Sequence, residues 1–329
     1  MHAVLEELKK IGIIPVIKID DAAKAVPLAK ALAAGGIPCA EVTFRTAQGE
    51  EAMRLINAEL CSGKTPGILL GAGTVLTTAQ VDKAIAAGAK FIVSPGFNPK
   101  VVSYCVEKGI PITPGCSNPS DIERALEYGL EVVKFFPAEQ AGGLEYIKAI
   151  AAPYTTMNFV PTGGINAQNV AKYIAYEKIL ACGGSWMVSA DLINAGEFGK
   201  ITALCREAQL NLLGMSVVHV GINADDENAA RKAAERFSAL FGFQNKDGNS
   251  SIFSGDGLEI MKSPYLGKNG HIAIGTNSVL RARAFFERQG VEFNAESAKT
   301  DAKGKPLAVY FKEEIGGFAV HLVQMKSEK

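Results

Sequence analysis

The stretch Asp20-Asp-Ala-Ala-Lys-Ala-Val-Pro-Leu-Ala-Lys-Ala-Leu-Ala-Ala34 is Ala-rich and amphipathic, and it is followed by Gly35-Gly36 and by an apolar run at 39–45. Asp20 or Asp21 can cap a helix at its start, and the two glycines can end it. The stretch therefore predicts a helix, and the run after it predicts a buried strand.

This helix-and-strand unit recurs through the first two-thirds of the chain. Ala79 to Ala87, ending at Gly88, repeats the helical pattern. Short runs rich in Val, Ile and Phe lie at residues 12–19, 39–45, 67–75, 91–96, 110–116, 131–137, 158–165 and 179–188. Continuous apolar strands separated by helices predict a parallel sheet that is covered on its faces. About eight such units in roughly 210 residues fit an α/β fold of the (β/α)8 TIM-barrel type. A doubly wound open sheet is the alternative, but no G-x-G-x-x-G follows the first run.

The style of the sequence changes after about Leu213. A strand of alternating character from Met215 to Ile222 is followed by a charged helix from about Asp225 to Phe241 and, later, by a second helix from Ser278 to Gln289. Further short strands are expected at 250–253, 258–261, 271–274, 307–311 and 318–323. One helix followed by antiparallel strands, done twice, predicts a separate α+β domain with an internal repeat. We therefore expect domains at 1–212 and 215–329.

Composition limits the class of partner. Lys plus Arg number 34 and Asp plus Glu number 34, which argues against nucleic acid or an anionic membrane as the main partner. No apolar run approaches the roughly 20 residues of a membrane span, and residues 1–10 have the pattern of an amphipathic helix and not of a signal peptide. The six cysteines are scattered without a C-x-x-C pair, as in a reduced cytoplasmic protein. A small-molecule partner is expected.

Lys134 lies in Glu131-Val-Val-Lys-Phe-Phe-Pro137, a segment otherwise built to be buried. A charged amine is expensive to keep among apolar neighbours, so the neutral form is favoured, and a neutral amine is the nucleophile of Schiff-base enzymes. The alternative is a lysine at a strand end whose ammonium reaches solvent.

Polar residues and glycines gather where the other predicted strands end, which is where barrel enzymes carry their active sites. The second strand ends Glu41-Val-Thr-Phe-Arg45, with an acid, a hydroxyl and a base on one side. The seventh and eighth end in Pro161-Thr-Gly-Gly164 and Gly183-Gly-Ser185, glycine-rich turns whose N–H groups, with a helix N-terminus, can hold phosphate. The alternative for Glu41 and Arg45 is a salt bridge on one strand face.

Several of these stretches together resemble the 2-keto-3-deoxy-6-phosphogluconate (KDPG) aldolase family, class I aldolases that also act on 4-hydroxy-2-oxoglutarate. The matching motifs occur in the family's order across roughly residues 10–208: Glu41-Val-Thr-Phe-Arg-Thr46, Gly71-Ala-Gly-Thr-Val75, Ser94-Pro-Gly96, Val133-Lys-Phe-Phe-Pro-Ala-Glu139, Pro161-Thr-Gly-Gly-Ile165 and Gly183-Gly-Ser-Trp186. One departure is Cys116-Ser-Asn-Pro-Ser-Asp121, where many relatives have threonine in place of Asn118 and glutamate in place of Asp121.

The resemblance implies a TIM barrel, usually a homotrimer, in which Lys134 forms the Schiff base and Glu41 is the general acid/base. It further implies a pyruvyl pocket and a phosphate site, and no cofactor for the aldolase. The implied substrate residues are Arg45, Thr74, Pro95 and Phe136 at the pyruvyl end and Thr162, Gly163, Gly164, Gly184 and Ser185 at the phosphate end. Whether the substrate belongs to the gluconate or the galactonate series stays open.

Three of the four histidines, His219, His271 and His321, fall in predicted strands of the second domain, and Glu259 lies in another. The arrangement resembles the vicinal-oxygen-chelate (glyoxalase/bleomycin-resistance) fold of paired βαβββ modules. By that resemblance the four residues are expected to bind a divalent metal, with His321 replacing the more usual glutamate. The alternative is that the histidines pack in the sheet.

Two further readings of the whole chain compete with an aldolase that carries an appended domain. In one, the barrel is a phosphate-binding scaffold and all activity lies in the second domain. In the other, the second domain is a non-catalytic sensor that regulates the aldolase. A buried amine at Lys134 distinguishes the first of these, because a scaffold has no use for it.

Overall fold

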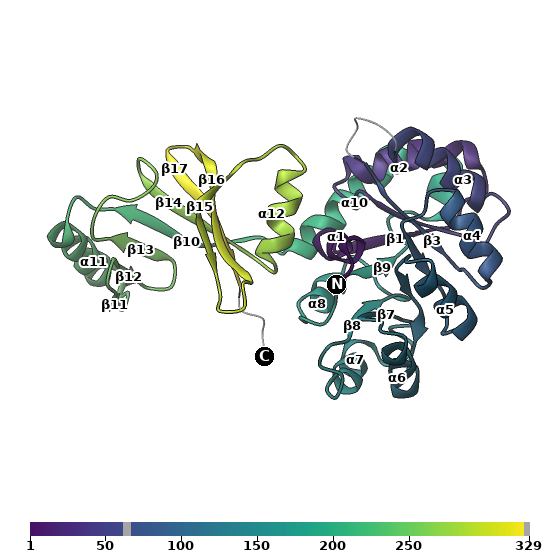
Figure 1. Cartoon of the computed structure of the whole chain (residues 1–329). Coiled ribbons are helices and arrows are strands. Elements are labelled where there is room, and N and C mark those ends of the chain that lie inside the picture. The colour runs from purple at the N-terminus through teal and green to yellow at the C-terminus, as the bar shows by residue number, and fades with distance from the viewer. Residues whose placement is uncertain (62–66, 326–329) are drawn as a thin grey trace. The chain divides into compact units, whose positions relative to one another are not determined.

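The structure is a computed structural model that describes residues 1–61 and 67–325 (Figure 1). The chain divides into two compact units, Met1–Leu212 and Leu213–Lys329. Residues 326–329, the end of the predicted second domain, lie outside the described part. Within the described ranges no helix has both the length and the apolar character needed to cross a membrane.

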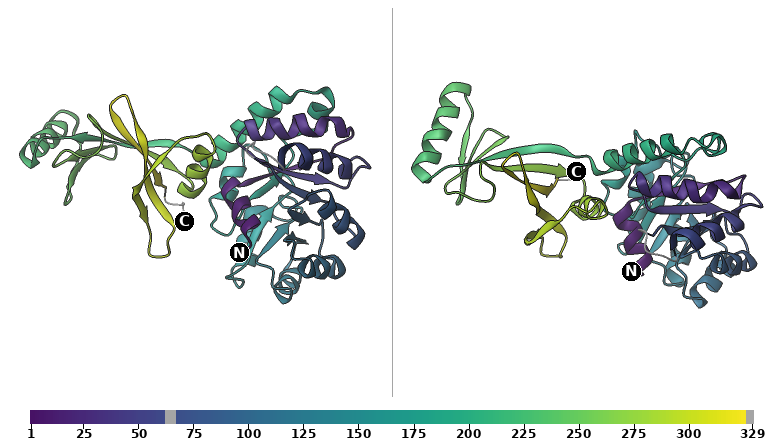
Figure 2. Two further views of the ribbon diagram at one scale, coloured as in Figure 1. Left: turned by 45° about the horizontal axis from the view of Figure 1, so that its top comes forward. Right: turned by 90° about the horizontal axis from the view of Figure 1, so that it is seen from above.

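The first unit is a ring of parallel strands with helices around its outside (Figures 1 and 2). The strands are β1 (Ile13–Ile17), β2 (Cys39–Thr43), β3 (Leu69–Gly73), β4 (Phe91–Val93), β5 (Ile112–Thr113), β6 (Gly115–Cys116), β7 (Val132–Phe135), β8 (Asn158–Pro161) and β9 (Cys182–Gly184). Two sheets, ordered β5-β4-β3-β2-β1-β9 and β6-β7-β8, are joined by the parallel bridges Phe159↔Ile179 and Thr162↔Gly183. The prediction of a TIM-barrel-like α/β fold is confirmed.

The predicted fifth strand is the one departure in this ring. The run at 110–116 forms two two-residue strands, β5 and β6, with Pro114 between them. Proline has no N–H group to donate to a sheet, so the ladder is interrupted at that position. The pairing resumes at once, since Gly115 N donates to Ser94 O over 3.0 Å.

The helices of the first unit begin where the sequence offers a cap. Asp21, one of the two predicted caps, accepts from Ala23 N at the start of η1, and Thr77 and Gln80 form a capping box at α4. The helical elements are α1 (Ala3–Ile11), η1 (Ala22–Lys24), α2 (Ala25–Ala34), α3 (Gly49–Ile56), η2 (Asn57–Cys61), α4 (Thr78–Ala86), α5 (Pro99–Glu107), α6 (Pro119–Glu127), α7 (Gly143–Ala151), α8 (Val170–Ile174), α9 (Ala190–Ala195) and α10 (Phe198–Leu213).

The barrel strands are buried on both sides, as continuous apolar runs require. Every residue of β1 and of β2 is buried, including Glu41 and Thr43. Thr43 is satisfied locally, because its hydroxyl donates to Ile17 O over 2.8 Å. All six cysteines are free, and five of them are buried.

The second unit consists of two βαβββ modules that form one mixed sheet. The first is β10 (Ser216–Asn223), α11 (Glu227–Phe241), β11 (Asn245–Asp247), β12 (Ser251–Ser254) and β13 (Leu258–Met261). The second is β14 (Gly270–Thr276), α12 (Val279–Glu287), β15 (Phe293–Thr300), β16 (Pro306–Ile315) and β17 (Phe318–Gln324). The strand order is β11-β12-β13-β10-β14-β17-β16-β15, so the modules meet where β10 pairs with β14.

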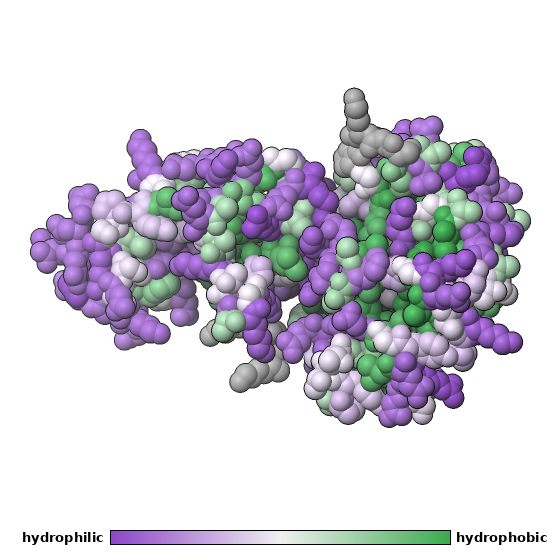
Figure 3. Space-filling model, viewed as in Figure 1, coloured by the Kyte–Doolittle hydropathy of each residue, from purple (hydrophilic) through white to green (hydrophobic). Residues whose placement is uncertain are grey.

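Two strands of this sheet were not predicted from the sequence. β11 is Asn-Lys-Asp, and β15 carries the polar run Asn-Ala-Glu-Ser-Ala-Lys-Thr after Phe293. Both lie at the sheet's two edges, where one side of the strand and most of its side chains meet water. Such strands lack the apolar pattern from which strands are recognised. Helix α11, in contrast, has the apolar face that makes an element recognisable from sequence. It packs Ala230 and Ala234 against Ile252 and Ile260, while its outer surface is hydrophilic (Figure 3).

Candidate functional site

Lys134 on β7 and Glu41 on β2 lie together inside the barrel. Lys134 Nζ is 3.9 Å from Glu41 Oε1, and the two residues are only 7% and 3% exposed. The ammonium also lies over the ring of Phe136, 5.3 Å from its centroid. This burial argues against a lysine that reaches solvent. The barrel closure brings an amine and a carboxyl, 93 positions apart in sequence, to one place.

The environment of Glu41 suits proton transfer. Burial raises the pKa of Glu41, and the positive charges of Lys134 and Arg45 oppose that effect without cancelling it. A carboxyl group whose pKa is raised towards neutrality can both accept and donate a proton at working pH. Arg45 is exposed, and the cation within 4.0 Å of Glu41 is Lys134. The predicted alternative, a salt bridge between Glu41 and Arg45, is therefore not the pairing found.

Backbone next to this pair is shaped by glycine and by strain. A Cβ atom on Gly73 would overlap the Glu41 carboxyl group, so the glycine makes room for it. The next residue, Thr74, has φ 56° and is the non-glycine residue with positive φ in the described part of the chain. A β-branched residue rarely adopts this conformation, and such strain concentrates at functional sites. On the neighbouring strand, a Cβ on Gly115, the register partner of Lys134, would meet the Pro95 carbonyl.

The two glycine-rich turns lie side by side, because Thr162 pairs in parallel with Gly183. Gly163 and Gly164 have φ of 98° and 79°, which glycine adopts freely. Within the described ranges, the N–H groups of these two glycines donate to no backbone carbonyl. Regular helix begins only at α8 and α9, several residues later, so the turns themselves present the N–H groups, in place of the helix N-terminus expected from the sequence.

The hydrogen bonds that hold these turns in place were not predicted from the sequence. Glu139 N donates to Gly163 O over 3.1 Å, and Ala138 N donates to Thr162 O over 2.8 Å. The carboxylate of Glu139 accepts a hydrogen bond from the Tyr173 hydroxyl. The segment after Lys134 is thus tied to the turn at 162–164. The acid at 139 was visible in the sequence, but its partner Tyr173, 34 positions away, was not.

The loop at 116–121, whose sequence departs from the family motif, forms a helix cap. Asn118 Oδ1 accepts from Asp121 N over 3.1 Å at the start of α6. In return Asp121 Oδ2 accepts from Ser117 N over 3.2 Å and from Asn118 Nδ2 over 2.9 Å. This is the reciprocal logic of a capping box, performed by a shorter acid and an amide. Asn118 and Asp121 therefore cap the helix start in place of the threonine and glutamate of many relatives.

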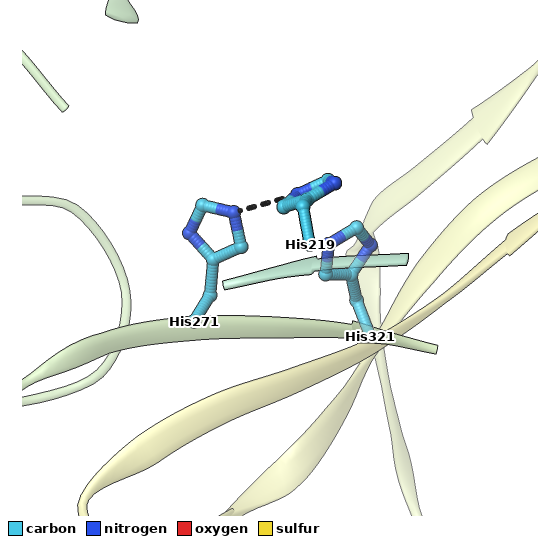
Figure 4. Close-up of side chains that lie close together, drawn as sticks. All are labelled: His219, His271 and His321. Atoms are coloured by element: carbon cyan, nitrogen blue, oxygen red, sulfur yellow. Dashed lines mark hydrogen bonds between the residues drawn. The ribbon is translucent and has the colours of Figure 1, made fainter. Parts of the chain in front are cut away.

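In the second unit the three predicted histidines converge from β10, β14 and β17 (Figure 4). Candidate ligand atoms of His219, His271 and His321 all lie within 4.8 Å of one another. His219 Nε2 and His271 Nε2 are 3.1 Å apart, and Glu259 Oε2 is 3.1 Å from each. All four side chains expected at the metal site thus meet on one face of the sheet.

The spacing of this cluster is compatible with the ligands of a divalent ion. Nitrogen ligands at about 2.0–2.1 Å from a tetrahedral zinc lie about 3.3 Å apart, close to the spacings found here. Both ring nitrogens of His321 are buried without a hydrogen-bond partner in the described structure, as is Nδ1 of His271. Buried polar atoms rarely stay unpaired, and each such case calls for an explanation. A metal ion would supply the missing partner of His321.

The register explains how the rings fit together. In one row across the sheet, Glu259 pairs with Gly221 and Gly221 with His271; a Cβ on Gly221 would overlap the His271 ring. In the next row His219 pairs with Ala273 and Ala273 with His321. Cross-strand neighbours point to the same face, so each ring stands beside a small residue.

The surroundings of the cluster set its charge. Burial lowers the pKa of His321 to about 4, and the neighbouring His271 and His219 add to that effect. Burial would favour the neutral acid at Glu259, but hydrogen bonds with His219, His271 and Ser251 hold the pKa of this carboxyl well below its usual range. Ser251 Oγ donates to Glu259 Oε1 over 2.7 Å and leaves Oε2 facing the imidazoles. Tyr310 stacks on His321 with ring centroids 4.5 Å apart.

Comparison with known sequences concerns the first unit. Residues 4–204 match the family model described as KDPG and KHG aldolase. The 2-dehydro-3-deoxy-phosphogluconate aldolase of Treponema pallidum (strain Nichols) is 51% identical over 215 residues, which are 65% of this chain and 100% of that protein. The KHG/KDPG aldolase of Escherichia coli (strain K12) is 43% identical over 196 residues, 60% of this chain and 90% of that protein.

Solved structures give the same likeness. The KDPG aldolase of Legionella pneumophila, with pyruvate captured at low pH as a covalent carbinolamine intermediate, superposes with a TM-score of 0.59 at 36% identity, over 62% of this chain and 97% of that chain. The 2-keto-3-deoxy-6-phosphogluconate aldolase of Zymomonas mobilis ZM4 with 3-phosphoglycerate has a TM-score of 0.56 at 38% identity, over 62% and 94%.

Proposed function

Since the chain belongs to the KDPG and KHG aldolase family, we propose that its first unit is a class I aldolase. Its substrate is 2-dehydro-3-deoxy-6-phosphogluconate, cleaved to pyruvate and glyceraldehyde 3-phosphate, and it also cleaves 4-hydroxy-2-oxoglutarate to pyruvate and glyoxylate. The observation that carries the proposal is the buried amine of Lys134 at 3.9 Å from the Glu41 carboxyl group. The gluconate series is preferred to the galactonate series because relatives at 51% and 46% identity carry the gluconate name.

The chemistry follows from this pair. Lys134 Nζ attacks the C2 ketone, and loss of water gives an iminium whose positive nitrogen accepts an electron pair. Glu41 takes the proton of the C4 hydroxyl as the C3–C4 bond breaks; the aldehyde leaves, and an enamine remains. Protonation of the enamine carbon and hydrolysis of the iminium release pyruvate and restore the lysine. The iminium supplies the electron sink, so the route contains no cofactor step.

The remaining predicted residues hold the two ends of the substrate. At the pyruvyl end we place Arg45, Thr74, Pro95 and Phe136, and at the phosphate end Thr162, Gly163, Gly164, Gly184 and Ser185. Support comes from the Phe136 ring beside Lys134, from the charge of Arg45 acting on Glu41, and from the N–H groups of the paired turns. By its family resemblance the aldolase works as a homotrimer in the cytoplasm.

A second function belongs to the second unit. We propose that His219, Glu259, His271 and His321 bind a divalent metal in a unit of the vicinal-oxygen-chelate type. The paired βαβββ modules, the 3.1 Å spacings and the unpartnered nitrogens of His321 support this proposal. Three imidazoles with one carboxylate suit zinc, nickel, cobalt or iron(II).

The lysine is tested by trapping. Borohydride reduction in the presence of pyruvate should add the mass of the reduced adduct at Lys134, because only a Schiff base is fixed in this way. Lys134→Ala should lose both the adduct and cleavage. Lys178→Met is the matched control, because burial lowers the pKa of Lys178 but its ammonium donates to Tyr154 O over 2.6 Å. Peptide mapping that finds the adduct only at another lysine would refute the assignment.

The proton carrier is tested by its pH dependence. Glu41→Gln should lower turnover by about two to four orders of magnitude, the usual worth of a general acid/base. Because the pKa of Glu41 is raised, its ionised form is lost as pH falls through a value above the ordinary 4.5, and cleavage should decline over that range. The variant's profile should lack this acid limb, with melting temperature nearly unchanged. Glu50→Gln, at an exposed carboxylate, should behave as wild type. Near-normal turnover of Glu41→Gln would exclude the role.

The phosphate site is tested by adding a like charge. Ser185→Asp should raise KM for the phosphorylated substrate, because the new carboxylate repels phosphate. Cleavage of 4-hydroxy-2-oxoglutarate, which has no phosphate, should change much less. Ser189→Asp adds the same charge at the N-cap of α9, where aspartate is also a good cap, and should have little effect. Equal losses on both substrates in Ser185→Asp would contradict a dedicated phosphate site.

The metal is tested by elemental analysis of purified protein. About one divalent ion per chain is expected, and a His219→Ala/His271→Ala variant should lose it because two of four ligands are gone. His2→Ala changes an exposed histidine of the first unit and should keep the metal. Aldolase turnover should survive chelation, since the Schiff-base route has no metal step. Metal content that is substoichiometric and unchanged by the double substitution would leave the histidines as packing residues.

A further inference from the structure

The donor set in the second unit has an unbalanced charge. Three neutral imidazoles and one carboxylate around a divalent ion leave a net charge of +1. A centre with excess positive charge inside a partly buried site attracts an anion more strongly than a neutral one does. The charge therefore indicates the kind of molecule that the site accepts.

The face of the sheet that carries the cluster continues into a cavity. Phe253 pairs with Glu259 across β12 and β13, and Lys246 pairs with Phe253 across β11 and β12. Cross-strand partners share a face, so Lys246, Phe253 and Glu259 point to one side. Two strand spacings, about 10 Å, separate the backbones of Lys246 and Glu259.

A cavity of about 580 Å³ lies at this place, with Lys246, Gln244, Ser251 and Phe253 in its lining. Two of these residues join it to the histidine cluster. Ser251 Oγ bonds Glu259, and the ring of Phe253 meets that of His219 edge to face, with centroids 5.7 Å apart. The cavity therefore adjoins the cluster through these two residues, and its volume suits a small organic molecule.

The cavity lining carries one cation, Lys246, and two carboxylates, those of Asp247 and Asp256. Asp247 is neutralised by Arg231 at 2.8 Å and by Lys262 at 2.7 Å. Lys246, in contrast, has no carboxylate oxygen within 4.0 Å of its ammonium in the described part of the chain, and its side chain is exposed to solvent. Asp256, the remaining acid of the lining, is exposed in the turn between β12 and β13, where water screens it.

We propose that this cavity binds a small organic or inorganic anion, held by Lys246 and Phe253 beside the positively charged metal centre. The proposal rests on the metal centre proposed above. Carboxylate and phosphate share the relevant chemistry, and the substrate and products of the first unit carry both groups. The second unit is therefore a site for an anionic metabolite, and Lys246 determines that specificity.

The test uses paramagnetic relaxation in the full-length chain loaded with cobalt(II). A Lys134→Ala background removes covalent capture of pyruvate by the barrel. Cobalt(II) speeds the relaxation of ligand nuclei within a few ångströms, so the methyl protons of pyruvate and the phosphorus of inorganic phosphate are the two probes. We expect saturable relaxation enhancement for one or both. Lys246→Met should raise the dissociation constant about two- to fivefold, the worth of one exposed charge pair.

The controls separate this site from the metal site. Lys232→Met removes the same charge from the exposed side of α11 and should leave anion binding unchanged. Enhancement for pyruvate alone identifies a carboxylate site, and enhancement for phosphate alone identifies a phosphate site. With cobalt bound, absence of any enhancement, or equal affinity in Lys246→Met and wild type, overturns the anion site alone. Failure of cobalt to bind overturns the metal centre and the anion site together.

Discussion

The burial of Lys134 against Glu41 is the constraint on which the first unit depends. Two ionisable groups with almost no contact with water are costly unless they stabilise each other, and at 3.9 Å they do so without a direct hydrogen bond. The surrounding barrel is arranged around this pair. Gly73 leaves space for the carboxyl group, and Gly115, beside the lysine, lets the Pro95 backbone approach. Replacing either glycine would press a methyl group into the site, so these small residues are part of the active-site design.

In the second unit, buried polar side chains are brought together by the register of the strand pairing. Its polar side chains come from strands that are distant in sequence, and they meet because cross-strand neighbours share a face. Gly221 and Ala273 stand between the rings of the cluster and keep space for them. The aromatic ring of Tyr310 then covers His321 from the neighbouring strand. The same sheet face extends through Phe253 to Lys246, so the cavity adjoins the cluster.

Much of this arrangement could be predicted from the sequence, because it rests on local patterns. The barrel strands are apolar runs that contain Lys134 and Glu41, and the glycine turns lie at the ends of two of them. The parts that were missed depend on contacts made only in the folded chain. Tyr173, on helix α8, supports Glu139 in the turn after β7. The edge strands β11 and β15 have no apolar stripe, since sheet pairing and not burial defines them. The function of Asn118 and Asp121 as a cap became clear only from their reciprocal hydrogen bonds.

Two glutamates of the chain show how position alone decides chemical role. Burial dominates at Glu41, whose nearest cation lies beyond hydrogen-bond distance, and its pKa is raised. At Glu259 hydrogen bonds of 2.7–3.1 Å outweigh burial, and its pKa is lowered. A carboxyl group that gains and loses a proton readily suits acid/base catalysis. A carboxylate that stays ionised suits a metal ligand, because a ligand must not be lost to protonation. The opposite pKa shifts therefore follow from hydrogen bonding, and they distinguish the proposed proton-transfer site from the proposed metal-binding site.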